Sequence, residues 1–230
     1  MPSFSSVTSR PIALTPAREA KVYGLFALAM GLTALGIIVG MRFAGMLLSS
    51  GVLIFCVIAE LAIIFTANWW RSQYPLNYLL FGIFPLLSGL TVTPYLMAIL
   101  AGYVNGGAIL LNAIASTTFM ALAAAVFARA TSWDLSGMGK GLFFAIIGLL
   151  LLGILQLFVP MLRVGSFELL LSGAGVVIFA LFTAYDIQRV QAAARMGMDP
   201  FMLALSLYLD IFNLFLYVLR FMTAISGQRR

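Results

Sequence analysis

The sequence predicts an all-α membrane protein with seven transmembrane helices, and three observations lead to that fold class. Of the 230 residues, 63% are hydrophobic and only 9% are charged, which leaves too little polar surface to cover a soluble globule. The apolar runs lack the alternation of barrel strands, and backbone groups inside a bilayer must pair within their own segment, so the spans are helices. No polar stretch is long enough for a second domain. We therefore expect a flexible tail over residues 1–20 and a single transmembrane domain over residues 21–226.

The residue types that are missing exclude several classes of protein. The chain has no histidine and one cysteine, Cys56, so it offers no His/Cys ligands for zinc or haem and no base for an intramembrane Ser–His protease. Its lysines, Lys21 and Lys140, flank spans, whereas a retinal protein needs a lysine within its last helix. We expect neither an enzyme nor a bound cofactor.

The first two spans are expected over residues 22–39 and 46–67. The first run is long for a signal-peptide core and no cleavage site follows it, so we expect it to be retained. The second ends in two tryptophans and Arg71, which mark a membrane interface. Glu60 lies eleven residues before Arg71, and eleven steps of about 100° return to nearly the same azimuth. A continuous helix would point both side chains into the same interior space.

Three further spans are expected over residues 78–100, 108–127 and 141–158. Pro85 and Pro94 predict a kink in the first of these. The longest polar connection, residues 129–140, precedes the last of them. Asp134 in this connection is expected to start a turn or a helix.

The last two spans, residues 169–190 and 201–222, each carry an aspartate where membrane helices normally have none. An ionisable group at that depth costs about 2.5–3.5 kcal/mol on insertion scales, so it normally faces the bundle interior or a water path. This makes Asp186 and Asp210 the functional candidates.

The last span also carries a polar stripe, which cannot face lipid cheaply. Its members follow one another at steps of three or four and are Ser206, Asp210, Asn213, Tyr217 and Arg220. We expect this helix to be the least lipid-exposed of the bundle. For Asn213 alone, hydrogen bonding between helices is the plainer explanation.

The basic residues predict which side of the membrane holds the N-terminus. With seven spans, eight basic residues fall on the N-terminal side and five on the other, three of which lie at the C-terminal end. This bias favours a cytoplasmic N-terminus. The C-terminal arginines argue the other way, so a re-entrant last segment stays open.

Four segments of the chain resemble motifs of one membrane-protein family. They are residues 88–94 (Ser-Gly-Leu-Thr-Val-Thr-Pro), residues 134–139 (Asp-Leu-Ser-Gly-Met-Gly), residues 184–189 (Ala-Tyr-Asp-Ile-Gln-Arg), and residues 204–220 with their Leu-Tyr-Leu-Asp and Asn-Leu-Phe core. On these motifs the chain resembles the Bax inhibitor-1 family, in its bacterial inner-membrane branch.

The resemblance implies both a fold and a function. It implies six helices wrapped around a central C-terminal helix, and a calcium leak of the inner membrane that is regulated by pH. Asp186 and Asp210 match the family's di-aspartate pH sensor, Arg71 its arginine partner, and Glu60 its acidic residue in the second span. Some bacterial relatives are instead linked to a membrane-anchored protease that they restrain.

Elementary electrostatics supports a switch at this pair. Two carboxylates about 4 Å apart at an effective dielectric near 20 repel by roughly 4 kcal/mol when both are ionised. The pair would therefore hold one proton up to about neutral pH. Our first hypothesis is a proton-gated Ca²⁺ leak, with Glu60 and Asn213 along the ion pathway. Because Ca²⁺ prefers oxygen ligands, we expect Ca²⁺ contacts at Asp186, Asp210 and Glu60.

Two alternatives belong to other classes of function. The first is a regulatory membrane protein that binds and restrains a membrane-anchored protease. The second is a proton-coupled transporter, for which we find no convincing internal repeat. In each case we expect a monomer in the lipid bilayer that binds no nucleic acid.

Overall fold

The computed structural model describes residues 16–49, 51–163, 165–196 and 199–226, and the regular structure of these residues is helical. The elements are α1 (Pro16–Arg42), α2 (Ala44–Ser49), α3 (Val52–Phe65), α4 (Ala67–Trp70), α5 (Leu76–Gly102), α6 (Gly106–Ala130), η1 (Leu135–Met138), α7 (Gly139–Phe158), η2 (Pro160–Arg163), α8 (Gly165–Met196) and α9 (Pro200–Ile225). Six of them, α1 and α5 to α9, are long and apolar enough to cross a membrane. The predicted all-α membrane fold is confirmed. Most of the predicted tail lies outside the described residues, but residues 16–20 already belong to α1.

The second span differs from its prediction because the structure breaks it into α2, α3 and α4. Gly51, with a φ of 66°, separates α2 from α3, and Thr66 separates α3 from α4. The 14 residues of α3 reach about 21 Å at 1.5 Å per residue, which is short of a hydrocarbon core of about 30 Å. The continuous helix that was to place Glu60 and Arg71 on one face is therefore absent, and the count of seven spans stays a prediction.

The packing of α1 on α5 nevertheless shows that the broken segment, α2 to α4, leads the chain from the end of α1 back to the level of its start. The Lys21 amine lies 5.7 Å from the centre of the Tyr78 ring, near the start of both helices. Further along both helices, Gly36 meets Gly89. The two helices therefore run parallel, and α2 to α4 must lead the chain back between them.

The contact between Gly36 and Gly89 brings two backbones together. A Cβ atom built on Gly36 would overlap the carbonyl oxygen of Leu86, and one on Gly89 would lie 2.9 Å from the Gly36 Cα. Small residues at such crossings let membrane helices approach closely.

Replacing Gly36 by alanine should therefore destabilise the bundle by about 1–3 kcal/mol, the usual cost of overpacking. Gly31 on the same helix has nothing within 4 Å of a Cβ, so Gly31→Ala is the matched control. Alanine favours helix over glycine by about 1 kcal/mol, so the control should be unchanged or slightly stabilised. Thermal unfolding in detergent measures both. Equal melting temperatures for the two variants would contradict the close crossing.

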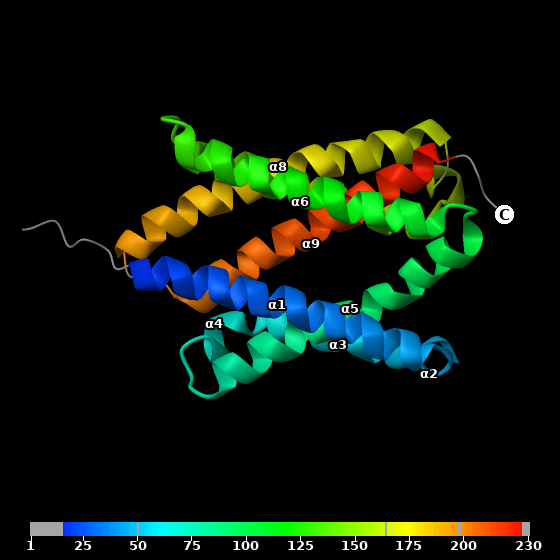
Figure 1. The fold of residues 1–230 in the computed structure, drawn as a ribbon, viewed down its shortest axis with the longest axis horizontal. Coiled ribbons are helices and arrows are strands. Elements are labelled where there is room, and N and C mark those ends of the chain that lie inside the picture. The colour runs from blue at the N-terminus through cyan, green and yellow to red at the C-terminus, as the bar shows by residue number, and fades with distance from the viewer. Residues whose placement is uncertain (1–15, 50, 164, 197–198, 227–230) are drawn as a thin grey trace, which may run out of the picture.

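The C-terminal helix α9 lies at the centre of the bundle. Figure 1 shows it running between α1 on one side and α6 and α8 on the other, and it contacts α1, α5, α6 and α8. Outside this group, α3 packs on α5 and α7 packs on α8. Half of an 18-residue apolar segment of α9 is buried inside the bundle, against 44% for the corresponding segment of α5 and 33% or less for the other spans. The prediction that this helix is the least lipid-exposed is confirmed.

Candidate functional site

The polar stripe of α9 lies along α8. From one end of the interface to the other, the facing residues are Asp210 and Asp186, Tyr217 and Gly175, and Arg220 and Glu168. As the residue numbers increase along α9, the numbers of the facing residues decrease along α8, so the two helices are antiparallel. A Cβ atom on Gly175 would overlap the Tyr217 ring, so this glycine makes room for the stripe. The periodicity of one helix thus predicted an interface, and the structure identifies its partner as α8.

The aspartate pair, Asp186 and Asp210, is almost fully buried, with 2% and 5% of the residue exposed. The two side chains interact with each other, and Asp186 also interacts with Ser206 of α9. Nevertheless, both oxygens of Asp186 and Oδ2 of Asp210 accept no hydrogen bond from the described residues. A buried acceptor without a donor is costly. A proton on one carboxyl would supply the missing donor, because a protonated carboxyl carries an O–H.

The cation beside the pair is Arg189, not Arg71. Its Nη1 lies 3.5 Å from Oδ1 of Asp186, one helical turn away on α8. Arg71 directly follows α4, and its carbonyl oxygen accepts a hydrogen bond from Nδ2 of Asn77 at 3.2 Å. Among the described residues, the ion pairs include none from Arg71. The spacing of Asp186 and Arg189 in the sequence was a sufficient signal for this pair, whereas the gating role of Arg71 stays a prediction.

Glu60 lies on another side of α9. Thr91 of α5 donates to both of its carboxylate oxygens, at 3.4 and 3.5 Å, and Glu60 interacts electrostatically with Tyr208. The Tyr208 hydroxyl in turn hydrogen-bonds Thr33 of α1 at 2.7 Å. Because two residues of a helix turn by about 200°, Tyr208 and Asp210 point to opposite sides of α9. Glu60 therefore does not join the aspartate pair.

This separation bears on the predicted Ca²⁺ contacts. The described residues contain no group of three or more His, Cys, Asp or Glu side chains that could hold a metal ion together. The three carboxylates predicted to contact Ca²⁺ therefore lie at two separate locations, Glu60 at one and the aspartate pair at the other. Asn213 is half-buried, and its amide donates to the carbonyl of Leu209 in its own helix at 2.7 Å.

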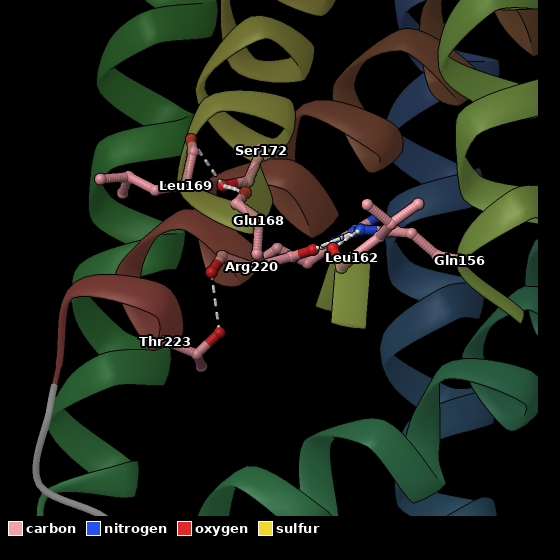
Figure 2. A network of polar contacts seen from close by, with 7 residues as sticks. All are labelled: Gln156, Leu162, Glu168, Leu169, Ser172, Arg220 and Thr223. Carbon is pink, nitrogen blue, oxygen red and sulfur yellow. Dashed lines mark hydrogen bonds and ion pairs between the residues drawn. The ribbon is translucent and has the colours of Figure 1, made fainter. Parts of the chain in front are cut away.

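Near the C-terminal end of α9 lies a second set of interacting polar side chains, which the sequence analysis did not predict. In this Arg220 cluster (Arg220, Glu168 and Gln156), the guanidinium donates to both carboxylate oxygens of Glu168, at 2.9 and 2.8 Å. It also donates to Oε1 of Gln156 at 2.8 Å. Figure 2 shows these side chains converging from α9, α8 and α7.

Two further bonds complete the Arg220 cluster. The Gln156 amide donates to Glu168 at 2.8 Å and to the carbonyl of Leu162 at 2.7 Å, which ties η2 to the same group (Figure 2). The guanidinium also lies 5.3 Å from the centre of the Tyr217 ring. The cluster therefore fastens three helix ends at the end of the α8–α9 interface opposite the aspartate pair. The signal that could have found it was Arg220 itself, because a cation in a buried stripe needs an acidic partner on a neighbouring helix.

Comparison with known proteins gives concordant matches over nearly the whole chain. The model of a family described as inhibitor of apoptosis-promoting Bax1 matches residues 16–228. An uncharacterized protein of Campylobacter jejuni is 32% identical, over 90% of this chain and 88% of its own. The Golgi anti-apoptotic protein of vaccinia virus is 33% identical, over 94% and 89%, and protein lifeguard 4 of Mus musculus is 28% identical, over 97% and 92%.

Proposed function

Because the chain belongs to the Bax inhibitor-1 family, we propose that this multi-pass membrane protein lets Ca²⁺ leak across the bilayer under the control of pH. The aspartate pair is the gate in this proposal. The observation that carries it is the burial of two interacting carboxyl groups, three of whose four oxygens accept no hydrogen bond from the described residues. With one shared proton, one carboxyl group can donate a hydrogen bond to the other. Without that proton, two negative charges face each other.

Loss of that proton replaces a hydrogen bond by a repulsion between α8 and α9. Among the described residues, the guanidinium of Arg189 is the one within ion-pair distance of Asp186, and a single cation offsets only one of two negative charges. The Arg220 cluster holds the opposite end of the same interface. The repulsion therefore acts on one end of a helix pair whose other end is held by the Arg220 cluster, so α8 and α9 would pivot about that cluster.

The ion would meet its oxygen ligands in succession. Glu60 and the aspartate pair lie on different sides of α9, and Ca²⁺ prefers carboxylate and carbonyl oxygens. In this proposal Asn213 and Arg71 border the same path, Ca²⁺ is the transported ion, and the monomer is neither an enzyme nor a cofactor carrier. The proposed location is the bacterial inner membrane with a cytoplasmic N-terminus.

The test is a Ca²⁺ flux measurement on the pure protein. Liposomes that contain this protein alone and a trapped Ca²⁺ indicator should admit Ca²⁺ at a rate that changes across about pH 5 to 9. Protein-free liposomes of the same lipid should not. A folded protein that gives no flux at any pH would overturn the proposal. It would leave the other hypothesis, a regulator that binds and restrains a membrane-anchored protease.

A further inference from the structure

A pocket of about 400 Å³ opens where the connection between α6 and α7 packs on the C-terminal half of α8. The residues that line it come from both sides and include Trp133, Asp134 and Ser136 of the connection and Tyr185, Gln188 and Arg189 of α8. Its volume falls within the usual range for small-molecule sites. The pocket lies outside the aspartate pair, with Arg189 as the residue between them.

The wall of this pocket is fixed by a side chain that bridges its two sides. Oε1 of Gln188 accepts from the backbone N–H of Leu135 at 2.7 Å, and its Nε2 donates to the carbonyl of Trp133 at 2.8 Å. Both ends of one amide thus hold the connection against α8. The pocket is therefore pre-formed and does not depend on a chance loop conformation.

The lining carries one charge of each sign. Arg189 lines the pocket with a side chain that is 39% exposed, and its Nη1 lies 3.5 Å from Oδ1 of Asp186. The Asp134 carboxylate accepts from the backbone N–H and the hydroxyl of Ser136, both at 2.9 Å. These two bonds hold the pKa of the Asp134 carboxyl below its usual value, so it is ionised at neutral pH. An anion or a cation alone would be repelled by the lining residue that carries the same sign of charge, so the pocket suits a ligand with one charge of each sign.

The position of the pocket indicates where such a ligand comes from. It lies where α6 ends at Ala130 and α7 begins at Gly139, which is the end of two apolar spans. Trp133 lines the pocket and is 72% exposed, as aromatic residues often are at the level of lipid headgroups. The nearest supply of small charged groups is therefore the headgroup layer.

We propose that this pocket binds the phosphoethanolamine headgroup of a membrane lipid, with the phosphate on Arg189 and the ammonium on Asp134 and the hydroxyl of Ser136. A phosphate suits a guanidinium because of the fork of N–H donors. A primary ammonium suits a carboxylate because it keeps its hydrogen-bond donors, which a choline group lacks. The phosphate would share Arg189 with Asp186, so lipid occupancy would touch the proposed gate; that link alone rests on the proposed function.

Native mass spectrometry of the purified full-length protein tests the binding without any flux measurement. The protein is offered equal amounts of phosphatidylethanolamine, phosphatidylcholine and phosphatidylglycerol with identical acyl chains. We expect phosphatidylethanolamine to be retained preferentially. Arg189→Gln should lower its retention roughly tenfold, the equivalent of about 1.4 kcal/mol. Asp134→Asn, on an exposed turn that asparagine can also form, should remove the preference over phosphatidylglycerol.

The matched control is Lys140→Gln, because Lys140 is an exposed cation in the first turn of α7 that does not line the pocket. It should bind lipid like the wild-type protein. Equal retention of the three lipids, a preference for phosphatidylglycerol, or a Lys140→Gln loss as large as that of Arg189→Gln would each overturn the proposal. Displacement of the lipid by an equal concentration of soluble phosphoethanolamine would overturn the lipid source and assign the pocket to the free compound.

Discussion

An Arg220→Met protein is expected to lose about 2–4 kcal/mol of stability in detergent, because it leaves the charge of Glu168 without its cation. The Glu168 side chain is 14% exposed and receives two short hydrogen bonds from this guanidinium. Gln156 would remain as a neutral donor to it. Methionine is close to arginine in length and keeps much of the packing, so the loss reports the missing charge and hydrogen bonds.

The double variant Arg220→Met/Glu168→Gln separates an unpaired charge from lost packing. With both charges removed, the double variant should be more stable than Arg220→Met alone, since no buried charge stays unpaired. Arg42→Met is the control, because Arg42 is exposed at the end of α1 and should change stability by less than about 0.5 kcal/mol. Equal melting curves for Arg220→Met and Arg42→Met would show that the Arg220 cluster contributes nothing to stability.

The parts of the fold that sequence could predict are those set by local hydropathy. Five predicted spans, from residue 78 onward, match α5 to α9 within a few residues at most ends, because a long apolar run in a bilayer has no alternative to a helix. The break of the second span was not predicted. An average of hydropathy along the chain does not register Gly51, whose left-handed backbone conformation precedes the start of α3 without changing how apolar the run is.

The candidate site divides in the same way. The stripe on α9 and the burial of Asp210 follow from helical periodicity, which can be recognised from the sequence of α9 alone. The pairing of Arg220 with Glu168 depends on the register between two antiparallel helices, which the sequence of neither helix contains. The ion pair of Asp186 with Arg189 is different, because both residues lie one turn apart on α8 and their spacing is visible in the sequence.

Replacing either aspartate of the pair by asparagine is expected to flatten the pH dependence of Ca²⁺ flux near neutrality. Asparagine keeps the shape and the hydrogen-bonding capacity of the side chain but can neither bind nor release the shared proton. Because the titration belongs to the pair, Asp186→Asn and Asp210→Asn should give similar profiles. The buried interaction between the two side chains is the structural reason to expect this equality.

Asp199→Asn is the matched control for the same chemical change. Asp199 caps the start of α9, where its side chain accepts from the backbone N–H of Phe201 at 2.8 Å. Asparagine caps helices about as well as aspartate, so this protein should keep the wild-type flux profile and the wild-type stability. Any change that all three asparagine variants share would come from charge in general and not from the pair.

If the aspartates served only to join α8 and α9, the asparagine variants would behave differently. A neutral amide can still bridge two helices, so each variant would alter thermal stability and leave the pH profile unmoved. Liposome flux measured across about pH 5 to 9, beside melting temperatures in detergent, separates the two outcomes. A folded Asp210→Asn protein whose flux keeps the wild-type pH profile would rule out the proton gate. In that case the buried pair would be a structural contact, and the protease-regulator hypothesis would become the one to test.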